Sequence, residues 1–284
     1  MNLPVIRSSD AASSDTALTV LPDADLAQLR QAHDLLENPG IAAQLANLVG
    51  APIEYVFRKQ LPRGVTKVIN STVQSALEKS LRVATATLDK DAAGRPARRG
   101  LHKLAVATTG AAGGAFGAMG LAVELPLTTT LILRSIAEIA RAEGESLQDP
   151  ATALACFEVL AMGGGGDRDD GAESGYFATR AVLAQQVAAA AQYIAAHGIS
   201  GKGAPAIVQF IAGIAARFSV TVSKKVALQS VPVIGAVSGA ALNTLFIGHF
   251  QSIARGHFIV RRLERQYGAA RVREAYAALG SKKG

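Results

Sequence analysis

Two glutamates and two histidines of this chain have the side-chain types that support acid–base or metal chemistry. Glu124 is the first residue of the segment ELPLTTTLILRSIAEIAR, and Glu138 lies near its end. His249 and His257 lie nearer the C-terminal end of the chain. Glu124 and Glu138 share one stripe of a predicted helix but are fourteen residues apart, so about 21 Å of helical rise separates them. The two glutamates cannot act as an acid–base pair by themselves.

The two histidines are also badly spaced for a shared role. They are eight residues apart, about 12 Å along a helix, whereas two ligands of one metal on a single helix need a spacing near four. A metal site would need Glu124 to reach one histidine from another helix. Arg134 and Glu138 are four apart, which fits an ion pair within one helix. The catalytic candidates are therefore Glu124, Arg134, Glu138, His249 and His257, and the metal candidates are Glu124, His249 and His257.

Motifs of established enzyme and cofactor sites are absent from the sequence. The glycine-rich run from Gly110 to Gly120 contains no GxGxxG after a strand and no Walker lysine. HExxH, the ExxH pairs of di-iron bundles and GxSxG are also missing. The single cysteine, Cys156, excludes an internal disulfide and has no local cation or histidine to activate it. The sequence therefore assigns no cofactor.

The elements that must hold these residues are predicted to be helices. Apolar residues make up 49% of the 284 residues and aromatic residues only 5%, with no Trp. Alanine-rich segments poor in β-branched residues favour helices that pack closely together. We therefore predict an all-α protein, a bundle of about nine to eleven helices.

A glycine- and alanine-rich apolar hairpin, residues 104–141, is the predicted centre of this bundle. Its first segment, LAVATTGAAGGAFGAMGLAV, has no charged side chain over twenty residues, and its glycines are spaced for close helix packing. The second segment begins near Leu125-Pro126, and Gly144 is predicted to end it. We expect the hairpin to pack against the apolar helices of residues 206–250.

Lys224-Lys225 is predicted to interrupt the apolar helix that starts near Ala206, and residues 226–248 then form a second uncharged stretch, twenty-three residues long. The stretch is long enough to cross a bilayer. Gln229, Pro232 and Asn243 lie within it, and basic residues flank both sides. A buried core helix, a segment dipping into the membrane interface and a true membrane span all stay open.

The domain organisation follows from breaks in these patterns. Residues 1–20 are rich in Ser, Asp and Ala without a sustained period, so we predict a disordered leader. Residues 21–284 then form one helical domain. The loop of residues 163–173, a glycine run followed by DRDDGAE, is the best candidate for a boundary between two lobes. Asp149-Pro150 has the cap-plus-proline pattern that starts a helix.

Charge is distributed unevenly along the chain, whose net charge is +7. Residues 58–103 carry eleven Lys/Arg against three Asp/Glu, and residues 255–284 carry eight against two. Such basic blocks suit an anionic membrane surface, whereas the alternative is a merely solvated helix face. We expect no nucleic acid, because these blocks lack interleaved aromatic residues. The candidate residues for contact with a membrane or partner are Arg98, Arg99, Lys103, Lys224, Lys225, Arg261 and Arg262.

Several segments together resemble the EcsC protein family. They are LLENPGIAAQLANLVGAPIE, ELPLTTTLILRSIAEIARAEG, DPATALACFEVLAMGG, ESGYFATRAVL, VPVIGAVSGAALNTLFIGHF and ARGHFIVRRLERQYG, in the family's order over roughly residues 30–276. The resemblance implies a mainly bacterial, helical protein without an agreed biochemical activity. Many members read PADLP where this chain has Ala122-Val123-Glu124-Leu125-Pro126.

The sequence favours a non-catalytic, membrane-associated accessory or interaction protein of the cytoplasm. The partner is an anionic membrane surface or a membrane protein. The cytoplasmic location follows from the lone cysteine and from an N-terminus without the order of a secretory signal. The alternative is a hydrolase-like or metal-dependent enzyme with its site between the central hairpin and the C-terminal helix. Convergence of Glu124, Arg134, His249 and His257 on one concave site would favour the enzyme.

Overall fold

The structure is a computed structural model that describes residues 21–37, 61, 63–87, 117–163, 175–197, 205–229 and 239–280. Within these ranges the side chains of residues 82–87, 117–124, 228–229 and 239–240 are not described. This part of the chain forms eight helices and no strand, which confirms the all-α prediction. The helices are α2 (Asp23–Leu36), α5 (Arg63–Thr87), α7 (Gly117–Ala142), α8 (Pro150–Met162), α9 (Gly175–His197), α10 (Pro205–Gln229), α11 (Gly239–Tyr267) and α12 (Ala269–Gly280).

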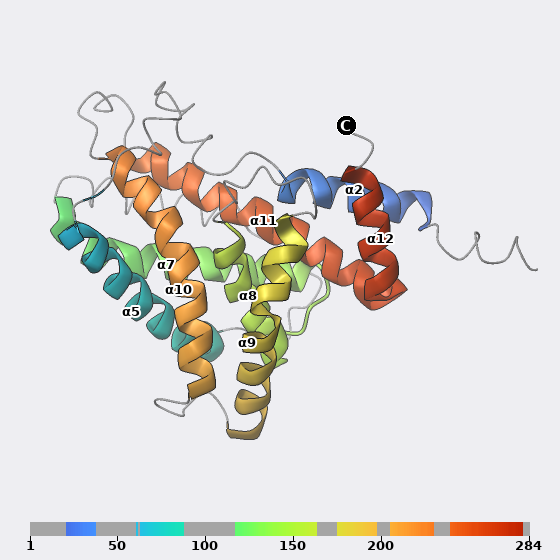
Figure 1. The fold of residues 1–284 in the computed structure, drawn as a ribbon, viewed down its shortest axis with the longest axis horizontal. Coiled ribbons are helices and arrows are strands. Elements are labelled where there is room, and N and C mark those ends of the chain that lie inside the picture. The colour runs from blue at the N-terminus through green and yellow to red at the C-terminus, as the bar shows by residue number, and fades with distance from the viewer. Residues whose placement is uncertain are drawn as a thin grey trace, which may run out of the picture.

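Helix α11 is the longest described helix and runs the length of the molecule (Figure 1). Helices α2 and α12 pack beside its C-terminal half, and α7 packs along it. Phe246, Phe250 and Phe258 of α11 are fully buried in the main apolar core. A second apolar cluster joins α2, α11 and α12 through residues such as Leu29, Val260 and Tyr276, and it also includes Tyr176 of α9.

Helix α8 is an interior helix. The Asp149 carboxylate caps it by accepting a hydrogen bond of 3.0 Å from the backbone N–H of Ala151, and Pro150 occupies the first turn, as the sequence predicts. Every residue from Thr152 to Ala161 is buried. A helix that is apolar all round suits such a position, and α7, α9, α10 and α11 all pack against it.

Helix α7 corrects the prediction that two helical segments meet at Leu125-Pro126. It continues from Gly117 to Ala142 with Pro126 inside it. Pro126 has no N–H group to donate within the helix. Its carbonyl oxygen accepts a 2.8 Å hydrogen bond from the Thr130 hydroxyl, one turn further along. The helix ends before Gly144, whose φ of 81° suits glycine. Residues 104–116 of the predicted hairpin lie outside the described residues.

Helix α10 corrects one further expectation. Lys224 and Lys225 do not interrupt the helix, since α10 continues through them to Gln229. Lys225 is buried at 5% exposure, with its Nζ atom 5.2 Å from the centre of the Phe246 ring, so the aromatic face compensates part of its charge. Of the uncharged stretch 226–248, residues 226–229 lie in α10 and residues 239–248 in α11, whereas residues 230–238 lie outside the described residues.

The predicted leader at residues 1–20 and the predicted boundary loop lie outside the described residues, apart from Gly163. The division of the chain into a leader and one helical domain stays a prediction. Tight helix crossings nevertheless tie distant segments together. A Cβ atom added to Gly163, at the end of α8, would lie 2.2 Å from the Phe250 ring of α11. That crossing brings the end of α8 against the middle of α11.

Candidate functional site

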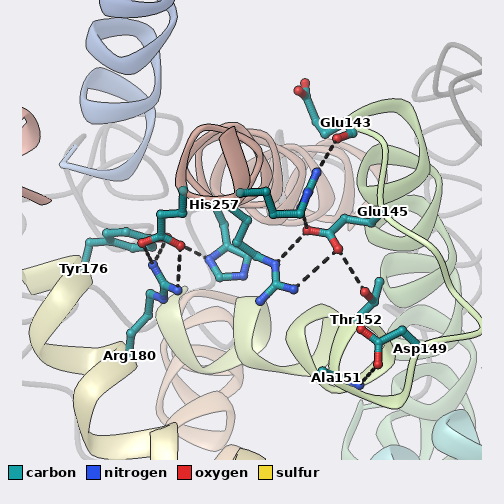
Figure 2. Close-up of polar contacts among 11 residues, drawn as sticks. Glu143, Glu145, Asp149, Ala151, Thr152, Tyr176, Arg180 and His257 are labelled. Carbon is teal, nitrogen blue, oxygen red and sulfur yellow. Dashed lines mark hydrogen bonds and ion pairs between the residues drawn. The ribbon is translucent and has the colours of Figure 1, made fainter. Parts of the chain in front are cut away.

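Buried and half-buried ionisable side chains from α8, α9 and α11 meet beside α8, together with a carboxylate that follows α7. We call this group the polar centre, and most of its contacts appear in Figure 2. Its members are Glu145, Glu158, Tyr176, Arg180, His257, Arg261 and Glu264.

The helical repeat explains why these residues meet. On α11 the spacing from His257 to Arg261 is four residues and the spacing from His257 to Glu264 is seven, so these side chains share one face. On α9 Tyr176 and Arg180 are four apart and face α11 together. Each helix therefore delivers its polar groups as one short stripe.

A chain of hydrogen bonds links Glu264 to His257 through α9. Arg180 donates two hydrogen bonds to the Glu264 carboxylate, at 2.8 and 3.0 Å, and a third of 3.3 Å to the Tyr176 hydroxyl oxygen. The Tyr176 hydroxyl lies 3.0 Å from Nδ1 of His257. Because Arg180 donates to the hydroxyl oxygen, the hydroxyl hydrogen is available to Nδ1, and the ring proton of neutral His257 then belongs on Nε2. Within the described structure, that buried Nε2 atom has no hydrogen-bond partner.

The second chain of contacts is centred on Glu145. Arg261 donates a 2.8 Å hydrogen bond to its carboxylate, Thr152 of α8 donates one of 2.9 Å, and Arg265 also binds it. Burial opposes ionisation of Glu145, but the hydrogen bonds and positive charges of Arg261 and the other donors outweigh it and lower its pKa. This carboxylate therefore fixes the start of α8 and the last turns of α11 relative to each other.

Glu158 differs from the other carboxylates of the polar centre. It is the only residue of α8 with a charged side-chain type, and its exposure is 6%. Burial raises its pKa to about 7, although the charges of Arg180 and Arg261 oppose the shift. Burial and the same two guanidinium groups hold the pKa of His257 well below its ordinary value. Both groups are thus favoured in their neutral forms.

Polar contacts outside the centre attach α2 to the rest of the fold. Arg262 donates a 3.0 Å hydrogen bond to Glu143 and also binds Gln28 of α2. The Tyr267 hydroxyl donates one of 2.5 Å to Asp25. These contacts place the N-terminal helix across the second apolar cluster.

The structure separates the two predicted histidines. His257 lies in the polar centre, whereas Nε2 of His249 lies 2.9 Å from the carbonyl oxygen of Gly163. Burial lowers the pKa of His249, and the Gly163 carbonyl partly opposes this. The described residues contain no group of three His, Cys, Asp or Glu side chains placed to hold a metal ion. His249 and His257 therefore have different hydrogen-bond partners, and the enzyme alternative that joins Glu124 to a histidine stays a prediction, because the Glu124 side chain is not described.

The three predicted residues of α7 are not joined to the histidines by any contact described above. Arg134 and Glu138 are half-buried, one turn apart. Glu124 lies within α7, but its side chain is not described. Burial raises the pKa of Cys156 to about 12, so this thiol is not activated, as the sequence suggests.

The predicted contact residues have varied surroundings. Arg98, Arg99 and Lys103 lie outside the described residues. Lys224 is half-buried near the end of α10, and Lys225 packs against Phe246. Arg261 and Arg262 are half-buried and paired with Glu145 and Glu143. The positive charges of these two arginines are therefore largely balanced by carboxylates within the fold.

Sequence reasoning missed most of the polar centre, namely Glu145, Glu158, Tyr176, Arg180 and Glu264. One signal was available, because Glu158 is the sole carboxylate in the apolar helix PATALACFEVLAM. Charged residues are almost never fully buried without a partner, so a lone acid in such a helix indicates a special environment. The pairing of Arg180 with Glu264 had no signal, since eighty-four residues separate them.

One described helix, Pro205–Ala227 within α10, is long and apolar enough to cross a membrane, and 44% of its most apolar window is buried.

No curated protein and no solved structure matches the chain. The model of the EcsC protein family matches residues 24–263, close to the range over which the sequence resembles that family. The chain therefore belongs to the EcsC protein family.

Proposed function

We propose that this EcsC-family protein is a non-catalytic accessory or interaction protein that associates with the cytoplasmic face of a membrane through α10. The observation that carries the proposal is an exposed apolar row on α10. The row consists of Val208, Ala212, Ala216 and Val220, each four residues from the next and therefore on one side of the helix. Val208 is 47% exposed and Val220 is 51% exposed.

The burial of α10 supports an interfacial position. A core helix of comparable apolar character would be mostly buried, whereas less than half of the most apolar window of α10 is buried. One side of α10 packs on the core through Phe210, Ile214 and Phe218. The opposite side carries the apolar row. This division suits a helix that lies in the plane of the membrane interface.

The charge of this region supports an anionic surface as the partner. No Asp or Glu occurs over the ninety residues 174–263, whereas eight Lys/Arg do. Arg217 and Lys224 are half-buried on α10. Basic residues near an anionic leaflet contribute about 1 kcal/mol each, and a nearby carboxylate would be repelled.

Helices α9 and α10 lie side by side and project together away from α11 (Figure 1). The exposed positions of α9 between Arg180 and His197 are Ala, Val and Gln, and they include Val182 at 60% exposure. The uncharged face of α10 therefore continues onto α9. The separation of His249 from His257 supports a non-catalytic role for the described part of the chain.

Vesicle sedimentation tests this function with matched variants. Val208→Asp/Val220→Asp places two charges in the apolar row, and Leu127→Asp on α7 is the control because Leu127 has the same 47% exposure as Val208. We expect the wild type and Leu127→Asp to sediment with vesicles containing anionic lipid, and the double variant to lose most of this binding. High salt should release part of the wild type, since it screens exposed charges beyond about 10 Å at 0.1 M.

Two results would overturn this function. Equal sedimentation of the double variant and the wild type would remove α10 as the membrane-binding element. Failure of the wild type to sediment with any vesicle would remove membrane association altogether. Circular dichroism of each variant checks that its helical fold is intact, and the surface position of all three residues makes that outcome the expected one.

A further inference from the structure

We propose that the groove between α11 and α12, which α2 fills in this structure, also binds the α2 helix of a second copy of this chain. Helix α2 packs against both helices beside the C-terminal half of α11 (Figure 1). The occupant is therefore an acidic amphipathic helix, and its docking builds a dimer in which α2 is exchanged between copies. Nothing in this inference depends on membrane association.

The floor of the groove is apolar and receives one face of α2. Leu29 and Ala32 of α2 are fully buried there. They are three residues apart and therefore share one side of the helix. This arrangement is the helix-in-groove mode of recognition. The buried apolar residues that α11 and α12 contribute are Ile259, Val260, Leu263, Val272 and Tyr276.

Gly256 of α11 determines how closely a helix can approach the groove. A Cβ atom at this position would lie 2.7 Å from the Leu36 side chain and 3.0 Å from the backbone oxygen of Ala32. An occupant must therefore bring its own backbone against Gly256. Helix α2 does so with a small residue, Ala32, at the crossing. A substitution at Gly256 blocks the groove without altering the sequence of α2.

Hydroxyl groups on the rim of the groove recognise acidic side chains of α2. The Tyr267 hydroxyl donates a 2.5 Å hydrogen bond to Asp25. The Tyr276 hydroxyl donates one of 3.0 Å to Glu37, directly after the helix. These two bonds lie three turns apart along α2. They therefore fix both ends of the occupant.

The charges of α2 and of the groove are complementary. Residues 23–37 carry four Asp/Glu and one Arg, whereas residues 255–273 carry six Arg and one Glu. Arg262 contacts α2 directly, because it binds Gln28 and lies 3.9 Å from the Asp25 carboxylate. Such complementarity favours an acidic helix over a basic one. Every copy of the chain carries a helix that meets this requirement.

Helix α2 can leave the groove while the main apolar core stays closed. Three residues within α2 are buried, whereas ten residues within α8 are buried. The buried residues of the main core come from α5 and from α7 to α11, and none comes from α2. Elements with few buried residues open locally at low free energy. Opening of α2 therefore exposes a groove on an otherwise folded molecule.

The length of chain between α2 and α5 permits exchange between copies. Residues 37–62 join the two helices, and twenty-six residues span at most about 90 Å when fully extended. Helix α11, with 29 residues, is about 44 Å long. An open α2 can therefore reach the groove of a neighbouring copy while its own α5 stays in place.

Mixing two full-length variants tests the exchange. Gly256→Val blocks its groove and keeps an intact α2, whereas Leu29→Asp keeps its groove and has an α2 that cannot bury its apolar face. Light scattering of the mixture should show a 1:1 complex of the two variants that neither forms alone. In hydrogen exchange, α2 of isotope-labelled Gly256→Val should gain about tenfold or more protection when unlabelled Leu29→Asp is added.

The double variant Gly256→Val/Leu29→Asp is the matched control, because it has neither a usable groove nor a usable α2. It should form no complex with Leu29→Asp, and a complex in this control would overturn α2 as the occupant. Absence of a complex in both mixtures, with α2 of Gly256→Val still unprotected, would overturn the exchange itself. No vesicles are present, so neither result bears on membrane binding.

Circular dichroism of each variant checks that its helices are formed. If Gly256→Val loses helical content, Arg262→Glu takes its place, because it sets a carboxylate beside Asp25 of α2. The same complex with Leu29→Asp is then expected, and its absence would again overturn the exchange.

Discussion

Arg180 and Glu264 show how individual residues of the polar centre depend on each other. Their bidentate ion pair lies largely away from water, with side-chain exposures of 23% and 14%. Removal of one partner from a buried pair costs about 3–5 kcal/mol, because it leaves an uncompensated charge, although the partial exposure here reduces that cost. Arg180 also donates to the Tyr176 hydroxyl. The ion pair therefore positions Tyr176, and through it His257, as well as joining α9 to α11.

His257 should make the protein sensitive to mild acid. Its folded pKa lies well below 6.5 because the ring is buried beside Arg180 and Arg261. The unfolded chain then binds this proton more readily than the folded protein does. The stability that neutral His257 provides is present above pH 6.5 and is lost as pH falls, by up to about 1.4 kcal/mol per pH unit.

We predict that His257→Asn weakens this acid sensitivity. The Asn amide oxygen can accept the Tyr176 hydroxyl in place of Nδ1, but it does not titrate. We expect a lower stability at pH 7.5, by about 1–3 kcal/mol from lost packing, and a smaller further decrease towards pH 5.5 than in the wild type. Urea unfolding at several pH values measures both effects. His197→Asn, at the exposed end of α9, is the control, and parallel curves for the wild type and His257→Asn would contradict the prediction.

At the scale of elements, Gly256 lets α2 approach α11 closely. A Cβ atom at this position would lie 2.7 Å from the Leu36 side chain and 3.0 Å from the backbone oxygen of Ala32. The backbone oxygen cannot move away without moving α2. The position therefore requires a residue without a side chain, and it sets the distance between the two helices.

We predict that Gly256→Val separates α2 from α11. Overpacking of this kind costs about 1–3 kcal/mol, and α2 should lose protection in hydrogen exchange while α5 and α8 keep theirs. Gly64→Val on α5 is the matched control, because a Cβ atom there meets nothing within 4 Å. If hydrogen exchange in α2 were the same in both variants, the close crossing at Gly256 would not determine its docking.

Local patterns predicted the helices well and their contacts poorly. The cap at Asp149 and the end of α7 before Gly144 depend on residues next to each other in sequence, and both are confirmed. Pro126 and Lys225 were predicted to break helices, but α7 and α10 continue through them. The polar centre depends on how α8, α9 and α11 cross. A period within one helix gives its buried face, but it does not identify the helix that covers that face.

At the scale of the whole molecule, charge and exposure divide the described structure into two regions. Paired carboxylates and arginines concentrate where α2, α8, α9 and α12 meet the C-terminal half of α11. Helices α9 and α10 project from that region without an acidic residue. Helix α9 carries Tyr176 and Arg180 in its first two turns and ends in the projecting part, so it connects the polar centre to the proposed membrane-binding face.

The chain contains no Trp, so a single introduced tryptophan reports on one place in the molecule. We predict that Trp at position 208 or 220 of α10 enters the membrane interface, where an amphipathic helix lies about 5–10 Å deep among headgroups and upper acyl chains. Vesicles with anionic lipid should shift the emission of Val208→Trp and Val220→Trp to shorter wavelength, and lipids brominated near the headgroup should quench it. Leu127→Trp on α7, equally exposed in the wild type at 47%, should keep the emission of a residue in water. If the protein binds vesicles while all three tryptophans remain in water, basic faces alone make the contact and α10 does not insert. Quenching by lipids brominated deep in the acyl chains, for both α10 variants, would instead place the helix across the bilayer.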